Sequence, residues 1–269
     1  MTKKRRLIIP IFIPHEGCPH QCVFCNQKGI TGIGSMPSPS DITETIKSYL
    51  ATWKDEGRRE VAFYGGSFTG LHREVQKEFL RTANDFICNG PIDSIRVSTR
   101  PDYISQECLA LLKDYGVETI ELGVQSMVDK VLRLSGRGHT SDDIVMAVRL
   151  LRGFGFKIGL QIMPGLPGDT VQTALYTVDR VIKLEPDFVR IYPTVVIEGT
   201  PLEIMYNKGD YTPWPIEAMA VLCKELVRLL EDAQIPIIRI GLQPTAELER
   251  SIIAGPYHPS FRQLISMDR

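Results

Sequence analysis

Short apolar runs alternate with amphipathic helical segments along most of this 269-residue chain, and no other feature restricts its fold as much. The runs are rich in β-branched and aromatic residues, and several end in glycine or polar turns. This is the pattern of a strand that leads into a helix. One run lies near the N-terminus, and the later runs lie at 61–64, 94–99, 119–124, 157–163, 188–192 and 236–242.

The number and character of the runs indicate the fold class. They make six βα units followed by one additional strand. Strands that are apolar throughout are typical of parallel sheets covered by helices. A closed barrel of eight units takes roughly 250 residues for its repeats, and here the count stops early. We therefore predict an α/β fold, a partial (βα)6 TIM-type barrel with an extra C-terminal strand.

No break in composition divides the chain, so we expect a single domain over residues 1–269 with its core at about 7–242. Residues 243–269 are rich in aromatic residues and proline, which predicts an extension that packs on the barrel. Their abrupt end after an apolar run is also compatible with a longer parent chain.

Charge and hydropathy limit the partners and the cellular location that we expect for the protein. The formal net charge is −1 and the pI about 6.5, so the total charge does not require an anionic partner. The basic start is followed by an apolar run that Pro10 and Pro14 interrupt, which predicts a first buried strand and not a secretory signal. No other long apolar segment is present and the thiols are clustered, so we expect a cytoplasmic protein without membrane association.

Three cysteines, Cys18, Cys22 and Cys25, lie within the eleven residues GCPHQCVFCNQ. Thiolates hold iron–sulfur clusters, and three of them leave one iron of a [4Fe–4S] cluster without a protein ligand. The alternatives are a zinc site completed by His15 or His20, a disulfide with an odd thiol, and chance. Zinc sites generally combine two separated ligand pairs, so the compact run favours a cluster.

The run resembles the CxxxCxφC signature of the radical S-adenosylmethionine (SAM) superfamily, with Phe24 at the aromatic position. The resemblance implies that SAM binds the open iron. It also implies that an electron from an external donor, such as flavodoxin or ferredoxin, reaches the cluster. Cleavage of SAM would then release methionine and a 5′-deoxyadenosyl radical that abstracts hydrogen from a substrate.

The resemblance also implies which residues hold SAM. Gly65 and Gly66 stand where the family has a glycine turn that approaches the methionine amine, and Ser67 replaces the usual acidic residue. Ser98, Arg100 and Gln125 would line the ribose and carboxylate region of SAM. The adenosyl end would be bordered by Gln161 and Met163.

Five further segments, STRPDYIS, ELGVQS, RGHT, MPGLPGDT and RIYPTVVIEGTPL, resemble the radical SAM domain of the catalytic subunit of Elongator, a tRNA wobble-uridine modifying enzyme. The chain resembles oxygen-independent coproporphyrinogen oxidase more distantly, and that enzyme has the same layout. The compact cysteine spacing, Ser98 and Arg190 depart from Elongator, which usually has glutamate and lysine at the last two positions. No segment corresponds to its acetyltransferase domain.

We therefore expect a radical SAM enzyme that acts in tRNA modification, with Tyr192 and Arg190 as its catalytic residues. The alternatives are a radical SAM enzyme for a small metabolite or tetrapyrrole, and a non-catalytic iron–sulfur or zinc scaffold. The sequence context does not decide the roles of two further residues, both from the segment RGHT. Arg137 could pair with a carboxylate or phosphate, and His139 suits either a structural or a substrate contact.

Overall fold

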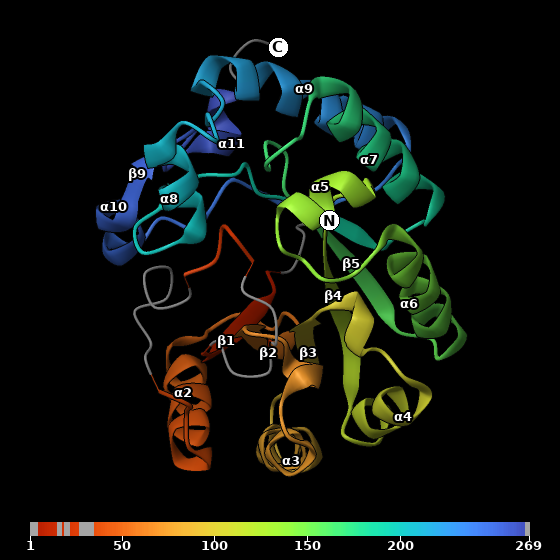
Figure 1. Ribbon diagram of the computed structural model, residues 1–269. Helices are drawn as coiled ribbons and strands as arrows, with labels where there is room; N and C mark the ends of the chain where they lie inside the picture. Colours follow the sequence, from red (N-terminus) through yellow and green to blue (C-terminus); the bar gives the residue numbers. More distant parts are fainter. Residues whose placement is uncertain (1–4, 15–17, 19–21, 27–34, 267–269) are drawn as a thin grey trace.

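The computed structural model describes residues 5–14, 18, 22–26 and 35–266. Within these residues seven parallel strands form one curled sheet in the order β1-β2-β3-β4-β5-β6-β8, drawn in Figure 1. The predicted partial barrel with an extra C-terminal strand is confirmed. The strands are β1 (Leu7–Ile13), β2 (Arg59–Gly65), β3 (Ser94–Thr99), β4 (Val117–Gln125), β5 (Lys157–Ile162), β6 (Phe188–Ile191) and β8 (Ile237–Ile240).

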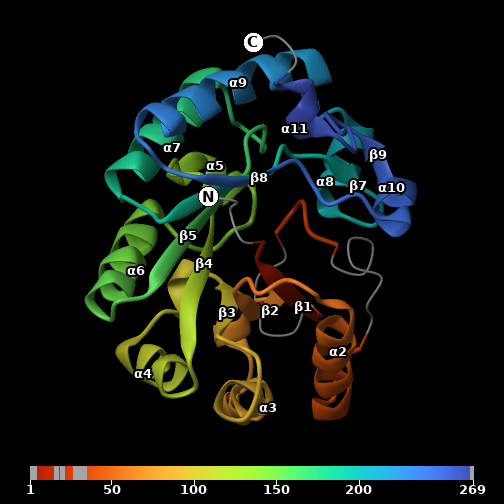
Figure 2. The ribbon, with the colours of Figure 1, turned by 180° about the vertical axis from the view of Figure 1, so that it is seen from behind.

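Helices cover the outer, convex face of this sheet (Figures 1 and 2). They are α2 (Pro39–Thr52), α3 (Arg73–Cys88), α4 (Gln106–Asp114), α6 (Ser141–Gly153), α7 (Val171–Lys183) and α9 (Ile216–Asp232). Most begin at a residue whose side chain bonds the first turn. In α6, the Thr140 side chain accepts from the Asp143 amide and the Asp143 side chain accepts from the Thr140 amide, which forms a capping box.

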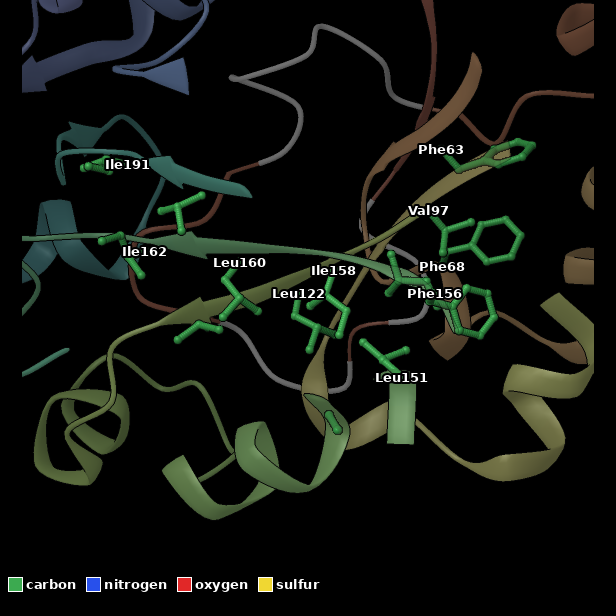
Figure 3. Packing of buried hydrophobic residues seen from close by; sticks show 14 of the residues in the cluster. Phe63, Phe68, Val97, Leu122, Leu151, Phe156, Ile158, Leu160, Ile162 and Ile191 are labelled. Atoms are coloured by element: carbon green, nitrogen blue, oxygen red, sulfur yellow. The ribbon is translucent and has the colours of Figure 1, made fainter. Parts of the chain in front are cut away.

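The main hydrophobic core lies between the sheet and these helices. Figure 3 shows Ile158, Leu160 and Ile162 along β5, with Leu151 of α6 beside the same sheet. All four side chains are almost fully buried. Burying an aliphatic side chain of this kind contributes about 1.5–3 kcal/mol, so each strand is tied to its covering helix.

The opposite, concave face of the sheet carries charged residues. Glu60 of β2, Arg96 of β3, Glu121 of β4 and Arg190 of β6 meet there in an unbroken chain of ion pairs. This face lies inside the curl of the sheet, and the helices of the described residues cover the other face (Figures 1 and 2). The carboxyl ends of the parallel strands meet at one rim of it, where function is expected in such folds.

The sequence did not predict a second, small sheet. Within the described residues, β7 (Val196–Ile197) pairs antiparallel with β9 (Ile252–Ala254) beside α8 (Pro201–Lys208) and α10 (Ala246–Ser251). Short elements of this kind carry too few residues to show a period. The remaining elements are α5 (Asp129–Leu134), α11 (Phe261–Leu264) and two 3₁₀ turns, η1 (Phe68–Gly70) and η2 (Pro101–Tyr103).

The last described segment returns to the barrel. Phe261 and Ile265 are both buried and belong to the main hydrophobic core. None of the helices in the described ranges combines the length and apolar character that a membrane span requires.

Candidate functional site

The cysteine segment follows β1 and lies at the carboxyl ends of the strands. Cys22 is buried, Cys18 and Cys25 are half-buried, and none of the three forms a disulfide. Two backbone hydrogen bonds attach the segment: the Val23 amide donates to the Ser135 carbonyl at 3.0 Å, and the Val23 carbonyl accepts from Leu202 at 2.8 Å. The loop is therefore held by parts of the chain more than a hundred residues away in sequence.

The glycine turn after β2 lies directly beside the end of β1. Gly65 has φ +103°, and a Cβ on it would lie 2.3 Å from the Ile13 carbonyl oxygen. The Gly66 amide donates to the same oxygen at 2.9 Å. Glycine is thus required where β1 ends and the cysteine segment begins, in addition to any contact with a cofactor.

We expect Gly65→Ala to destabilise the protein by about 1–3 kcal/mol and to lower the iron bound after reconstitution, because the clash displaces the end of β1. Urea unfolding and iron analysis measure the two effects. The matched control is Gly155→Ala, since Gly155 also has positive φ, +69°, but open space around it. Equal losses in the two variants would contradict a specific role for the contact with Ile13.

Ser67 and Arg100 connect the glycine turn to the end of β3. The Ser67 hydroxyl lies 2.8 Å from that of Thr99 and accepts from the Arg100 amide at 3.3 Å. Burial raises the pKa of the Cys18 thiol, and a hydrogen bond from the Ser67 backbone opposes this rise. Ser67 therefore contributes its amide to the cysteine site and its side chain to the frame around it.

The Arg100 guanidinium is buried and clamped by Asp102. Its Nε and Nη2 donate to the two carboxylate oxygens at 3.0 and 2.8 Å. Nη2 also donates to the Arg137 carbonyl, whereas Nη1 is buried without a partner among the described residues. Nη1 of Arg100 is thus unused within the described residues, and although burial opposes the charge, Asp102 raises the pKa of Arg100.

Arg137 reaches the cysteine segment from the loop after α5. Its Nη1 donates to the Cys22 sulfur at 3.3 Å and its Nη2 to the Gly123 carbonyl at 2.6 Å. The residue is 6% exposed, and its Nε is buried without a partner among the described residues. The structure records the Cys22 thiol as a partner of its side chain, and the carboxylate or phosphate that the sequence suggested stays a prediction.

Gln125, Gln161 and Met163 are brought together at the ends of β4 and β5. The Gln125 carbonyl accepts from the Met163 amide at 2.9 Å, and the Gln161 amide group donates to the Gln125 side chain at 3.4 Å. Gln125 has φ +66°, an uncommon conformation for a residue with a Cβ, and the strand register shifts there. Such strained backbone is concentrated at functional sites.

Arg190 and Tyr192 lie on the inner face of the sheet. Arg190 donates to the Tyr192 hydroxyl at 3.3 Å and to the Tyr64 hydroxyl at 3.1 Å, and pairs with both carboxylate oxygens of Glu121. Although burial opposes its charge, Glu121 raises the pKa of Arg190. The side chain of Tyr192 therefore points into the barrel and not into the outer core.

Two predicted cofactor residues have no contact with the others that the structure records. Phe24 packs partly against the small hydrophobic cluster of Val196, Leu202 and Tyr211. Ser98 lies half-buried on β3, in register with Glu121 of β4.

Known proteins share both the sequence and the fold. A family model described as the radical SAM superfamily matches residues 12–181. The chain belongs to the radical SAM superfamily. A second model, for the C-terminal domain of radical SAM proteins, matches residues 186–269 of this radical SAM protein.

Its relatives include tRNA-modifying enzymes. The uncharacterized protein MJ0486 of Methanocaldococcus jannaschii is 34% identical over 220 residues, 78% of this chain and 67% of that protein. The tRNA uridine(34) acetyltransferases of M. jannaschii and Dehalococcoides mccartyi are 26% and 27% identical, over 77% and 83% of this chain. They are matched over 46% and 55% of their own lengths, so the chain spans about half of each.

Solved structures share the fold. Methanocaldococcus infernus Elp3, lacking its N-terminal residues, aligns with 99% of this chain and 63% of its own at a TM-score of 0.76 and 21% identity. Escherichia coli coproporphyrinogen III oxidase, HemN, aligns with 86% of this chain and 53% of its own at 0.60 and 19% identity.

Family membership makes this radical SAM protein an enzyme whose cofactors are a [4Fe–4S] cluster and SAM. The described residues fit a cluster: none of the three cysteines forms a disulfide, and Cys18 and Cys22 lie near two buried guanidinium groups that each keep a nitrogen without a recorded partner. Those residues contain no group of three or more His, Cys, Asp or Glu side chains arranged around a single metal ion. A cluster does not need one, because each thiolate binds a different iron. His15 and His20 lie outside the described residues.

The sequence did not single out Glu121 and Tyr64, which contact Arg190 on the inner face, or Arg96 and Glu60, which continue the chain of ion pairs from Glu121. A signal was present, because charged residues interrupt strands that were predicted to be apolar. A charge in a buried strand must find a partner, so each one predicts an ion pair inside the barrel.

The side chain of His139 is fully buried near Arg137, with its Nδ1 3.9 Å from the Asp102 carboxylate. Burial, aided by Arg137 and Arg100, lowers its pKa from 6.5 to about 3. Unfolded chains take up this proton below pH 6.5, whereas the folded protein does not until about pH 3. The contribution of neutral His139 to stability is therefore complete above pH 6.5 and is lost on acidification.

We expect the apo-protein to lose up to about 1.4 kcal/mol of stability per pH unit through His139 below pH 6.5. The His139→Gln variant should show a flatter decline when urea unfolding is measured between pH 7 and about pH 4. The matched control, His72→Gln, changes an exposed histidine and should keep the wild-type pH dependence. Parallel curves for His139→Gln and wild type would contradict the prediction.

Proposed function

We propose that this protein binds a [4Fe–4S] cluster through Cys18, Cys22 and Cys25 and uses SAM to modify a substrate, with tRNA as the first candidate. The observation that carries the proposal is the convergence of donors on the thiols. A backbone amide from Ser67 and a guanidinium from Arg137 reach the cysteines from different strand ends. When bound, the reduced cluster and SAM supply a 5′-deoxyadenosyl radical that abstracts hydrogen.

In this proposal the strand ends hold SAM. Phe24 and the Gly65-Gly66-Ser67 turn border the cluster and the methionine end. Ser98, Arg100 and Gln125 hold the carboxylate and ribose, and Gln161 and Met163 border the adenosyl end. The unused Nη1 of Arg100 supports this assignment, because a buried donor needs an acceptor such as a carboxylate.

Tyr192 contacts the substrate in this proposal, and Arg190 orients its hydroxyl. Arg190 donates hydrogen bonds to Glu121, Tyr64 and Tyr192, so it can hold these side chains in fixed positions. An arginine forms this forked set of contacts better than a lysine would, because its donors are fixed in one plane.

The choice of tRNA as substrate is supported by the relatives named tRNA uridine(34) acetyltransferase. Because the chain spans about half of those proteins, we propose the radical step on tRNA and not their whole reaction. The chain would work as one radical SAM domain in the cytoplasm, where tRNA is present. An external one-electron donor such as flavodoxin or ferredoxin would reduce the cluster.

Anaerobic reconstitution with iron and sulfide, followed by dithionite and SAM, tests the radical chemistry. We expect 5′-deoxyadenosine and methionine as products, and an EPR signal of the reduced cluster that changes when SAM is added. Bound zinc in place of iron, or a cluster signal that ignores SAM, would contradict the proposal and favour a non-catalytic scaffold.

Binding of bulk tRNA across a salt series tests the substrate. A protein that contacts phosphates should lose affinity linearly in log[salt], with a slope that reports the number of contacts. Binding without such a slope, or no binding while SAM is cleaved, would contradict tRNA and favour a small metabolite or a tetrapyrrole.

A further inference from the structure

Arg137 carries a buried positive charge against the cysteine segment. Its Nη1 lies 3.3 Å from the Cys22 sulfur, and the residue is 6% exposed. Its other recorded partners are the Gly123 carbonyl and the backbone of its own loop, which are uncharged. In the described part of the chain, the structure records no carboxylate paired with this guanidinium.

The neighbouring groups do not neutralise this charge. The Asp102 carboxylate is already paired with Arg100, because its two oxygens accept from Arg100 Nε and Nη2 at 3.0 and 2.8 Å. His139, with a pKa lowered to about 3 by burial, is uncharged near neutral pH. An unpaired buried charge is strongly unfavourable, so Arg137 requires an anionic partner, and the Cys22 sulfur, a proposed cluster ligand, is in contact with it.

The position of Arg137 is fixed from both sides. Its amide donates to the Leu132 carbonyl at 3.0 Å, and its carbonyl accepts from Arg100. Two residues earlier, the Ser135 carbonyl accepts from Val23 of the cysteine segment at 3.0 Å. The loop that carries Arg137 is thus docked on the loop that carries Cys22, so the contact between guanidinium and sulfur does not depend on one flexible side chain.

We propose that Arg137 is a positioning residue that donates a hydrogen bond to the cluster ligand Cys22 and thereby raises the reduction potential of the cluster. The inference rests on the proposed function, because it requires a cluster at the three cysteines. Hydrogen bonds to ligand sulfurs and the net charge around a cluster are both determinants of its potential.

The direction of the effect follows from the charges. A [4Fe–4S] core with three thiolates is an anionic site, and reduction adds one electron to it without making or breaking a bond. The electron comes from an external low-potential donor, and Arg137 keeps all its protons. A fixed positive charge and a donated hydrogen bond stabilise the more negative, reduced form more than the oxidised form.

The test is an EPR-monitored redox titration of the reconstituted 269-residue protein and of Arg137→Gln, without SAM. At the wild-type midpoint potential we expect the ratio of reduced to oxidised cluster in Arg137→Gln to be about tenfold lower, which corresponds to 59 mV for a one-electron couple. Arg137→Lys keeps the charge but not the forked donation, so we expect a smaller shift in the same direction.

The matched control is Arg133→Gln, which removes a positive charge from an exposed residue of α5. It should keep the wild-type potential.

If the cluster of Arg137→Gln has the wild-type reduction potential, the inference is overturned. This holds even if Arg137→Gln binds less iron, because a lower iron content alone indicates a merely structural role. If Arg137→Gln binds no cluster, the titration of Arg137→Lys decides: a wild-type potential overturns the inference and a lower one supports it. Failure of the wild type to bind a cluster would instead overturn the proposed function.

Discussion

Cys22→Ala is expected to abolish cluster binding and the formation of 5′-deoxyadenosine from SAM. Cys22 is the buried member of the three thiols and receives the Arg137 hydrogen bond, so its removal takes away one iron ligand and leaves a buried guanidinium without an anion. Loss of an outer partner of a metal ligand typically costs about 10–100-fold in affinity or activity, and loss of the ligand itself should cost more. Iron and sulfide analysis and product chromatography measure the outcome.

The chain offers a matched control in Cys88→Ala. Cys88 is also a free thiol, but it is exposed at the end of α3 and its sulfur donates to the Asn84 side chain at 3.4 Å. This variant should keep the wild-type iron content and activity. If Cys22→Ala and Cys88→Ala bind equal amounts of iron, the cluster is not held by the segment after β1.

The parallel sheet could be predicted because its signals are local. Each strand faces a helix on one side, as with Ile158 and Leu160 of β5, and it therefore appears in the sequence as an apolar run followed by a turn. The cysteine spacing is local as well. The small sheet of β7 and β9 could not be predicted, because its pairing joins residues such as Val196 and Ala254 that are distant in sequence and too few to show a pattern.

The contacts within the site depend on tertiary structure. Arg137 and Cys22 are 115 residues apart, and no local pattern connects them. The ion pairs of Glu121 join three strands, and they form only because register and curl bring those strands to one face. For Gly65 the cofactor contact stays a prediction, and the structure adds a steric reason for glycine, the nearby Ile13 carbonyl.

Glu121→Gln is expected to cost about 3–5 kcal/mol in the free energy of unfolding, the range for breaking a buried ion pair by removing one partner. Glu121 is 5% exposed and pairs with Arg96, which is 3% exposed, and with Arg190, which is 11% exposed. An amide cannot neutralise two buried guanidinium groups, and Glu60 is already paired with Arg96. Since small domains are stable by about 5–15 kcal/mol, urea unfolding should show a large shift of the midpoint.

Glu118→Gln is the matched control, because Glu118 lies on the same strand and also pairs with two cations, Arg58 and Lys157, but its side chain is 40% exposed. Exposed pairs contribute about 0–1 kcal/mol, so this variant should stay close to wild type. The double variant Glu121→Leu with Arg190→Met removes both charges of one pair, and we expect it to lose less stability than the sum of the two single variants. Additive losses, or equal losses for Glu121→Gln and Glu118→Gln, would show that the charges on the inner face do not hold β3, β4 and β6 together.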